Sequence, residues 1–363
     1  IGKLTFVEEF GVRSLTIPIG PAVRKFYSIA GRFLCVEAFD DWSARVAEHI
    51  FSEFHLGLPS PKEPAQVDHA IKIRSTDHLP VVPSGLSSFE IEGGHCYTNQ
   101  QTNYLDVDGS MIVVGARASD TSLSVPTVEV WLGTDPGARE NQAVSRVMLY
   151  AMDAAMRRSG LYQLHGAGVV DPDSGGSALI IGASGSGKST LTLQLAVRGW
   201  LYLTDDTLLI SEKNGTVEAR GLKKKFAAAE TSLRSYNLPR LEEALGNFDA
   251  LEPWKRRFRP NVLFPDQLAS VCVPTAIFFS RVKRDMQDTR SHIRRISQMD
   301  AMTRLVRTSP WATYDSSVSR DYLGVLALLS RQAKSYELQA GFDIYNQPDV
   351  TATLLTQYVS GAV

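Results

Sequence analysis

A short glycine-rich segment has the residue types and the spacing of a phosphate-binding loop. Residues 182–189 read GASGSGKS and fit the pattern G-x-x-x-x-G-K-[ST]. Glycines let successive backbone N–H groups turn toward an anion, and the positive end of a helix that starts here adds to the attraction. The apolar run SALII precedes the motif and the helical run LTLQLAV follows it, as such a loop requires. The sequence therefore predicts that the chain binds a nucleoside triphosphate.

The predicted nucleotide contacts form one continuous segment of the chain. They are Gly182, Ala183, Ser184, Gly185, Ser186, Gly187, Lys188, Ser189 and Thr190. We expect Lys188 to reach the β- and γ-phosphates and the Ser189 hydroxyl to ligate Mg²⁺. The cofactors implied by the motif are ATP and Mg²⁺.

Two adjacent carboxylates, Asp205 and Asp206, follow the next apolar run, Trp200–Thr204. Ligands of α/β sheets bind at the carboxyl ends of strands, so this is the expected place for a Mg²⁺ ligand or a catalytic base. Adjacent residues on a strand point to opposite faces, and only one of the two is therefore expected to face the γ-phosphate. The alternative is a turn in which an aspartate acts as a cap.

Four motifs, taken in order, carry a resemblance to a known family. They are His165-Gly166, the loop GASGSGKST, the run RGWLYLTDD and the segment Glu218-Ala219-Arg220-Gly221. Together they resemble the catalytic domain of HPr kinase/phosphorylase, over about residues 160–280. The resemblance implies a serine protein kinase whose domain fold is related to that of phosphoenolpyruvate carboxykinase and distinct from that of eukaryotic protein kinases.

The resemblance also implies roles for individual residues. One of Asp205 and Asp206 would deprotonate the acceptor hydroxyl and the other would help to hold Mg²⁺. We place Asp206 in the metal set, and Glu218 would complete the metal shell with Ser189. The predicted catalytic residues are Asp205, Asp206, His165, Lys188 and Arg220.

Two of these roles have simpler alternatives. His165 would lie near the γ-phosphate, but a histidine between apolar residues could equally belong to the core or to a sheet edge. Arg220 would help to organise the phosphates or the sheet. Because Glu218 and Arg220 are two residues apart on an expected strand, they could also form a surface ion pair.

The sequence departs from the family at several points. Thr190 stands where HPr kinases usually have glutamate, and LKKKFAAAE follows Gly221 where the family has a glycine-bearing segment. The N-terminal half shows no match to the family's own N-terminal domain. The chain looks more like divergent HPr-kinase-like proteins found beside biosynthetic operons. Some of those resemble kinases that phosphorylate a serine of a small ribosomal precursor peptide, as in lasso-peptide pathways.

The predicted function is therefore an ATP-dependent kinase that transfers the γ-phosphate to a serine or similar hydroxyl of a peptide or protein. A kinase for a small metabolite would use the same residues. A nucleotide-dependent switch without transfer chemistry would need only the loop, and the Asp-Asp pair and the His-Gly pair argue against it.

The apolar patterns predict an α/β protein of two domains. Residues 1–140 are expected to form a mixed α+β domain of unknown or substrate-docking role, and residues 141–363 an ATP-binding catalytic domain. In the first domain we expect strands at Ser14–Ile17, Gly31–Val36, Met111–Val114 and Thr127–Leu132 and a helix at Asp41–Phe54. In the second, an apolar stripe predicts a helix from Asn141, and a strand–loop–helix–strand unit surrounds the glycine-rich motif.

Composition narrows the class of protein and its partners. The 363 residues are 44% hydrophobic and 21% charged with a net charge of −1, so no overall field attracts nucleic acid or a membrane surface. No run approaches the roughly 18 apolar residues of a membrane span. The cysteines Cys35, Cys96 and Cys272 form no CxxC pair and fit a reducing compartment. We expect a cytoplasmic protein without nucleic-acid or membrane partners, and the family resemblance leaves a homo-oligomer open.

Positive charge is concentrated in the second half. Residues 251–310 hold 12 basic and 5 acidic side chains, and Lys223–Lys225 and Lys255–Arg259 are basic runs. Such runs could contact phosphates or an acidic peptide. A solvated basic surface is the simpler interpretation.

Overall fold

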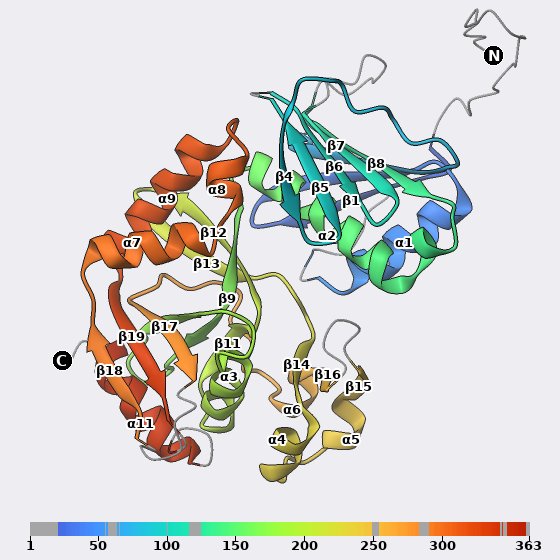
Figure 1. Ribbon diagram of the computed structural model, residues 1–363. Helices are drawn as coiled ribbons and strands as arrows, with labels where there is room; N and C mark the ends of the chain where they lie inside the picture. The colour runs from blue at the N-terminus through green and yellow to red at the C-terminus, as the bar shows by residue number, and fades with distance from the viewer. Residues whose placement is uncertain are drawn as a thin grey trace, which may run out of the picture. The chain divides into compact units, whose positions relative to one another are not determined.

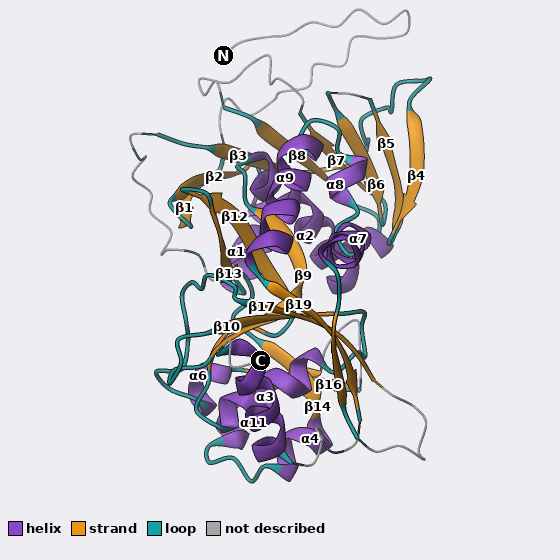
Figure 2. Ribbon diagram, turned by 90° about the vertical axis from the view of Figure 1, so that its left-hand side faces the viewer, coloured by secondary structure: helices purple, strands orange, loops and turns teal. Residues whose placement is uncertain are grey.

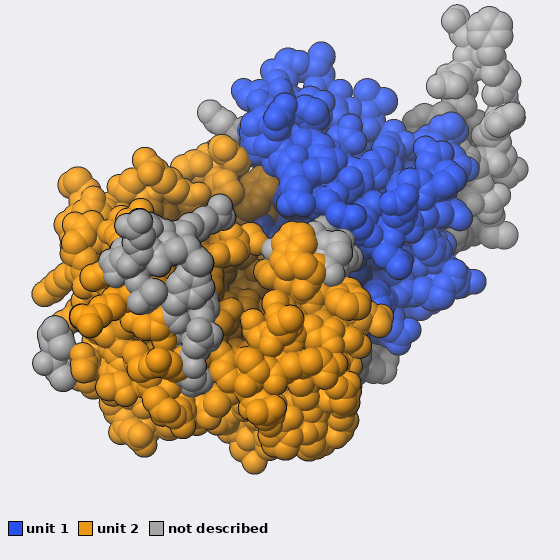
Figure 3. All heavy atoms as spheres, turned by 60° about the horizontal axis from the view of Figure 1, so that its bottom comes forward, with its two compact units in different colours: residues 1–52, 56–155 blue, residues 53–55, 156–363 orange. Residues whose placement is uncertain are grey.

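The computed structural model describes residues 21–54, 56, 64, 66–99, 101–115, 125–248, 254–282, 290–341, 343 and 347–360. The chain forms two compact units, residues 1–52 with 56–155 and residues 53–55 with 156–363, shown in two colours in Figure 3. Helix α2 (Asn141–Arg158) runs through the boundary. The sequence predicted a division at the start of this helix; in the structure, residues 141–155 belong to unit 1 and residues 156–158 to unit 2.

Unit 1 is built on an eight-stranded mixed sheet with the order β1-β2-β3-β8-β7-β6-β5-β4 (Figure 1). The pairs β2–β3 and β3–β8 are parallel and the others antiparallel. Its elements besides α2 are β1 (Val23–Ile29), β2 (Arg32–Ala38), α1 (Asp41–Ser52), β3 (His69–Thr76), β4 (Ser87–Ile91), β5 (Gly94–Thr98), β6 (Asn103–Val107), β7 (Ser110–Val114), β8 (Thr127–Gly133) and the 3₁₀ helix η1 (Gly137–Arg139). The mixed α+β character predicted for this half is confirmed, and the predicted strand Ser14–Ile17 lies outside the described residues.

Unit 2 holds the remaining elements. In chain order they are β9 (Tyr162–Val170), β10 (Ser177–Ile181), α3 (Lys188–Val197), β11 (Leu201–Thr204), β12 (Thr207–Lys213), β13 (Thr216–Gly221), β14 (Phe226–Ala229), α4 (Glu230–Ser235), α5 (Leu241–Ala244), β15 (Leu245–Phe248), β16 (Lys255–Phe258), α6 (Pro260–Leu263), β17 (Ala276–Val282), β18 (His292–Arg295), α7 (Gln298–Arg307), α8 (Trp311–Tyr314), α9 (Ser319–Gln332), β19 (Lys334–Ala340) and α11 (Pro348–Val359).

The main sheet of unit 2 is mixed, with the order β13-β12-β9-β10-β17-β19-β18, and β11 also pairs with β9. Helices cover both faces, with α3 and α11 on one side and α7, α8 and α9 on the other (Figure 2). Alternate residues of the strands supply the two cores. Leu179 and Ile181 pack with α9, while Ala178 and Ile180 pack with α3 and α11. The coarse prediction of an α/β protein with large mixed sheets is confirmed.

The predicted strand–loop–helix–strand unit is present as β10, α3 and β11. The two strands run parallel, with β9 between them and antiparallel to both. The helix starts at Lys188 and ends at Val197. This arrangement brings the end of β10 and the end of β11 to the same edge of the sheet.

A separate sheet of three short strands, β14-β16-β15, lies beyond β13 in the chain. Its aromatic residues Phe226 and Phe258 pair across β14 and β16 and pack with Tyr202 of β11. The small sheet is therefore anchored to the main one by a buried aromatic cluster.

No helix among the described residues is both long enough and apolar enough to cross a membrane.

Candidate functional site

The glycine-rich segment forms a tight turn between the buried strand β10 and helix α3. A Cβ atom on Gly182 would lie 2.5 Å from both the Ser186 Oγ and the Ser280 carbonyl oxygen, so only glycine fits there. Gly187, the residue before the helix, has a φ of 90°, which also favours glycine. The Ser280 hydroxyl donates to the Ser186 carbonyl over 2.7 Å and ties the loop to β17. The local structure is the strand–loop–helix context that the motif requires.

Lys188 is buried at the base of this loop. Its ammonium donates to the carbonyl oxygens of Gly182 and Ala183, over 2.8 and 3.1 Å. Ala183, Ser184 and Gly185 form the exposed tip of the loop, whereas Ser189 and Thr190, in the first turn of α3, are partly buried. The Lys188 ammonium and the amino end of α3 therefore lie together at the loop, and both favour the binding of an anion.

The two aspartates occupy a break between β11 and β12, both of which pair with β9. The Gly166 N–H of β9 donates to the Asp206 carbonyl oxygen over 2.8 Å, and Gly166 pairs on its other side with Ile181, the last residue of β10. The aspartates consequently lie one strand away from the point where β10 enters the loop. The predicted proximity of the acidic pair and the loop follows from this register.

Asp205 turns toward the first turn of α3. Its carboxylate interacts with the Ser189 side chain and accepts a hydrogen bond of 3.2 Å from the Ala227 N–H of β14. The residue is 2% exposed. Burial, followed by the negative charge of Asp206, raises the pKa of Asp205 to about 7.

Asp206 faces a different set of partners. One carboxylate oxygen lies 3.2 Å from the His165 Nδ1, and the other accepts hydrogen bonds from the Lys223 ammonium and, over 2.8 Å, from the Thr207 hydroxyl. Burial alone would raise the pKa of Asp206, but Lys223 and His165 outweigh it and hold this pKa well below its usual range. Asp206 is therefore ionised throughout the neutral range.

The pKa values of His165 and Lys223 are also shifted by burial and by the charge of Asp206. Burial is the main reason that the pKa of His165 is lowered; Asp206 opposes this shift, and the positive charges of Lys188, Lys223 and Lys255 add to it. Burial also opposes the charged form of Lys223, but Asp206 raises the pKa of Lys223 overall. Near pH 7 the site thus combines a neutral imidazole, a carboxylate and an ammonium.

Two glycines of the family-like motifs are required by close packing. A Cβ on Gly166 would lie 3.0 Å from the Ile180 carbonyl oxygen, and one on Gly221 would lie 2.0 Å from the Leu203 carbonyl oxygen. Gly166 and Gly221 hold β9 and β13 tightly against their neighbours on either side of the acidic pair. Close packing therefore explains why each of the His-Gly and Arg-Gly dipeptides has glycine as its second residue.

Glu218 and Arg220 do not join this group. Strand β13 runs antiparallel to β12, so Glu218 pairs with Ser211, which is five residues, or roughly 16 Å, along the strand from Asp206. Its carboxylate contacts the Arg220 guanidinium at 2.9 Å instead. The assignment of Glu218 to the metal shell is therefore corrected, and the pair matches the ion-pair alternative.

Lys223 is a site residue that the motifs did not identify. The turn at Asn214-Gly215, with both residues at positive φ, joins Lys213 to Thr216 and fixes the register of β12 and β13. Continued along the hairpin, that register brings residue 223 opposite Asp206. The Asn-Gly turn was the signal in the sequence that could have located this lysine.

The residues that could hold a divalent cation are few. Within the described ranges no group of three His, Cys, Asp or Glu side chains is close enough to bind a metal. Mg²⁺, however, usually takes only one or two carboxylates and completes its shell with phosphate oxygens and water. The Ser189 hydroxyl and the Asp205 carboxylate are hard oxygen donors beside the loop and fit that requirement. Asp206, the predicted metal ligand, is engaged by Lys223 and His165.

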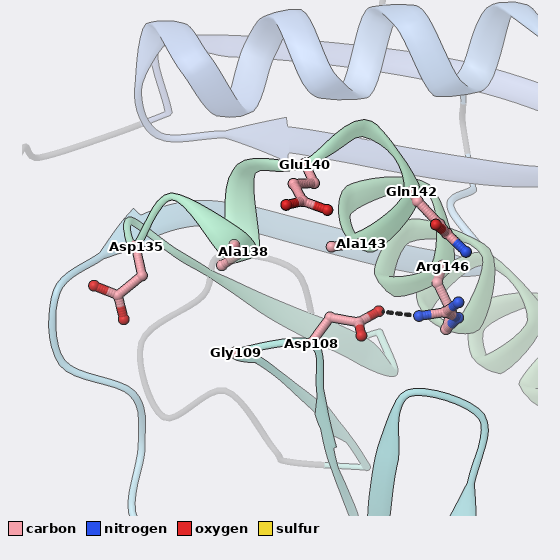
Figure 4. Close-up of a pocket in the computed structure, with 9 residues that line it drawn as sticks. Asp108, Gly109, Asp135, Ala138, Glu140, Gln142, Ala143 and Arg146 are labelled. Atoms are coloured by element: carbon pink, nitrogen blue, oxygen red, sulfur yellow. Dashed lines mark hydrogen bonds and ion pairs between the residues drawn. The ribbon is translucent and has the colours of Figure 1, made fainter. Parts of the chain in front are cut away.

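A separate pocket of about 440 Å³ lies in unit 1 and contains none of the predicted site residues. Asp135, Glu140 and Gln142 line it, and Asp108 and Arg146 are joined by an ion pair at its side (Figure 4). The ion pair neutralises Arg146, the one basic side chain among the described residues that line the pocket. This pocket shares no residue with the glycine-rich loop.

Comparison with known proteins identifies no family for the chain. No family model matches the chain, and no curated protein matches it. Among solved structures there is a weak similarity to the HPr(Ser) kinase/phosphatase from Coxiella burnetii, with 12% identity and a TM-score of 0.28, covering 54% of this chain and 94% of that one. A structural similarity with so low a TM-score gives no information on function.

Proposed function

We propose that the chain is an ATP-dependent kinase that transfers the γ-phosphate to a serine or similar hydroxyl of a peptide or protein. The observation that carries the proposal is that two adjacent carboxylates beside a phosphate-binding motif have different partners. Asp205 interacts with Ser189 of the loop, whereas Asp206 pairs with His165 and Lys223.

Phosphoryl transfer needs little covalent help from a protein and depends on positioning and on neutralisation of charge. Lys188 and the backbone N–H groups at the start of α3 would bind the β- and γ-phosphates. Ser189 and Asp205 would hold Mg²⁺, which supplies neutralisation of the phosphate charge when bound. These groups would together bind the nucleotide.

The second carboxylate would act on the acceptor. In the transfer, the acceptor oxygen forms a bond to the γ-phosphorus, the bond from that phosphorus to the β,γ-bridging oxygen breaks, and ADP leaves. Asp206 would orient the hydroxyl and accept its proton as the new bond forms. Lys223 keeps Asp206 ionised, and neutral His165 fixes the orientation of its carboxylate.

The test is transfer of label from γ-labelled ATP. Wild type, Asp206→Asn and the control Asp173→Asn, an exposed residue outside the site, would be incubated with a cell extract that includes small peptides. Labelled species would be identified by gel and by mass spectrometry. We expect a labelled peptide or protein with wild type and with Asp173→Asn, and none with Asp206→Asn although ATP still binds.

Other results would assign another function. A labelled small metabolite would make the chain a metabolite kinase. Release of free phosphate at the same rate in wild type and Asp206→Asn, with no labelled acceptor, would make it a nucleotide-dependent switch and would refute the role of the acidic pair.

A further inference from the structure

Three arginine side chains converge on one carboxylate in the main sheet of unit 2. One oxygen of the Glu337 carboxylate lies 2.7 Å from the Arg294 Nη2. The other oxygen lies 3.5 Å from the Nη2 atoms of both Arg281 and Arg304. The carboxylate belongs to β19, and the arginines come from β17, β18 and α7. We call these three arginines the arginine cluster.

Strand register explains why the cluster forms. Glu337 pairs with Phe279 of β17 on one side and with Arg294 of β18 on the other, so these side chains share one face of the sheet. Phe279 packs with α7, and the Arg304 guanidinium lies over its ring, 5.5 Å from the centroid. The Glu337 side chain is 9% exposed, whereas those of Arg281 and Arg294 are 63% and 72% exposed. The carboxylate is therefore the buried base of a cluster that opens to solvent.

The positive charge of the cluster exceeds the negative charge beside it. Three guanidinium groups face the carboxylate of Glu337, and the one other acidic group that acts on Arg294 is Asp300 of α7. A guanidinium carries five N–H donors in a planar fork, and a carboxylate has only two oxygens to accept them. The cluster therefore has donors and charge for a second anion with several oxygens, as in a phosphate group.

The cluster lies at the edge of the sheet where ligands of α/β proteins bind. Strands β10, β17 and β19 are parallel, and Arg281 is the last residue but one of β17. The chain leaves β10 through α3 on one face of the sheet. Between β17 and β19 it passes through α7, α8 and α9 on the other face (Figure 2). Ligands bind outside the carboxyl ends of strands at such a switch point.

The cluster is nevertheless separate from the phosphate-binding loop. Ser280 of β17 touches the loop, since its hydroxyl donates to the Ser186 carbonyl oxygen over 2.7 Å. Arg281 is the next residue on the strand and points to the opposite face. Glu337 lies two strands from β10, which is about 10 Å. Lys188 and the amino end of α3 therefore remain available to the nucleotide at the loop.

We propose that Arg281, Arg294 and Arg304 form a second anion site that binds a phosphate group, either as inorganic phosphate or as a phosphate ester. The planar forks of the guanidinium groups match phosphate oxygens in geometry and in charge. Because Glu337 already holds the three side chains in place, little side-chain freedom is lost on binding. The inference does not depend on the proposed kinase function.

The test is a calorimetric titration with inorganic phosphate above pH 7. A saturating non-hydrolysable ATP analogue and Mg²⁺ would be present, so that phosphate does not bind at the loop. The proteins are wild type, Arg281→Ala, Arg294→Ala and the control Arg331→Ala, an exposed residue in the last turn of α9. We expect wild type and the control to bind phosphate equally. The Kd should rise about tenfold or more in the two cluster variants, as for loss of a charge-assisted hydrogen-bonding partner.

Thermal unfolding with and without phosphate separates lost binding from lost folding. Phosphate should raise the Tm of wild type and of Arg331→Ala, and it should raise the Tm of the cluster variants less. Phosphoserine in the same titration distinguishes the two forms of the ligand. Tighter binding than that of inorganic phosphate would assign an ester, and weaker binding would assign the free ion.

Three results would overturn the proposal. They are no phosphate binding by wild type, the same Kd in the cluster variants as in Arg331→Ala, and binding that occurs only when the ATP analogue is left out. The last result would assign the phosphate to the loop. None of the three bears on transfer of phosphate from ATP, so the proposed kinase function would be unaffected.

Discussion

The carboxylates of Asp205 and Asp206 are adjacent in the chain and have their pKa values shifted in opposite directions. Asp205 is buried against Ser189 and the Ala227 N–H, and its pKa rises to about 7. The pKa of Asp206, paired with Lys223 and His165, falls below its usual range. Separation of two titrations in this way is typical of sites in which two carboxylates have different tasks.

The raised pKa of Asp205 predicts a cost to stability in the metal-free protein. In the unfolded chain this carboxyl ionises near pH 3.8, but in the folded protein only near pH 7. The contribution of Asp205 to the free energy of unfolding is therefore most favourable below about pH 4. It falls as the pH rises to 7, by on the order of 4 kcal/mol, and stays low at higher pH. Asp205→Asn should be more stable than wild type at pH 8 and similar at pH 4.

Urea unfolding in EDTA at several pH values would check this prediction. The quantity to compare is the difference between Asp205→Asn and wild type, because other carboxyl groups contribute equally to both. Added Mg²⁺ should stabilise wild type more than the variant. A difference that does not change between pH 4 and 8 would show that Asp205 does not titrate in this range.

Lys223 should control the acid limb of the transfer reaction. Lys223→Met removes the strongest charge that lowers the pKa of Asp206, so this pKa should rise and the carboxylate should be lost at a higher pH. The pH profile of kcat/KM should then move its acid limb upward. Lys224→Met, the same change at the exposed neighbouring residue, is the matched control and should leave the profile unchanged. Identical profiles in all three proteins would exclude this role for Lys223.

Most of the site could be predicted from the sequence because its motifs are local. The loop and the start of α3 need only a run of glycines and a helical pattern. Gly166 and Gly221 were identified by motif, and close backbone contacts explain them. What local patterns cannot show is register between strands. The family resemblance placed Glu218 in the metal shell, but the antiparallel pairing of β12 and β13 puts Glu218 far along the strand from Asp206 and places Lys223 beside it.

The fold was predictable to different degrees in its two parts. Strands that are wholly buried, such as β7 and β10, and helices with a single apolar stripe, such as α2, were found within one or two residues. The hairpins β4 to β6 and the small sheet of β14 to β16 were missed. Strands β4, β5, β15 and β16 have four or five residues with at most one buried position each, so pairing with neighbours decides their conformation rather than their own pattern.

Gly221 should tolerate no side chain. A Cβ there would lie 2.0 Å from the Leu203 carbonyl oxygen. Because the position of a Cβ is fixed by its own backbone and the oxygen is a backbone atom, β13 would have to move away from β11. We expect Gly221→Ala to lower the free energy of unfolding by about 3 kcal/mol or more. Gly324→Ala is the control, since its Cβ meets nothing within 4 Å on the exposed side of α9. That change should stabilise by roughly 0.5–1 kcal/mol.

Thermal and urea unfolding of the two glycine variants would measure these effects. Because β11 leads directly into Asp205, surviving Gly221→Ala protein should also transfer phosphate more slowly than wild type at the same folded fraction. Equal stability of Gly221→Ala and wild type would mean that β11 and β13 are not packed as closely as described.

The end of α2 is held by a buried ion pair that has no part in the proposed chemistry. Asp315, with a side chain 1% exposed, accepts hydrogen bonds from the Arg157 Nε at 2.8 Å and from Arg158 at 3.1 Å. Arg157 also lies over the Trp311 ring. Burial alone would raise the pKa of Asp315, but the two arginines outweigh it and lower this pKa. The stability contributed by the pair is therefore present at neutral pH and is lost as the pH falls below the carboxyl's usual range.

Removal of one member of this group should be much more damaging than removal of a surface pair. Asp315→Ala leaves the buried guanidinium group of Arg157 and the partly buried one of Arg158 without their carboxylate and should cost about 3–5 kcal/mol. Arg240→Ala, which breaks an exposed pair with Glu243, should cost less than about 1 kcal/mol. Urea unfolding at pH 7 would give both values, and at low pH the penalty of Asp315→Ala should shrink, because wild type loses the same charge. A penalty for Asp315→Ala that equals that of Arg240→Ala at pH 7 would show that the group does not stabilise unit 2.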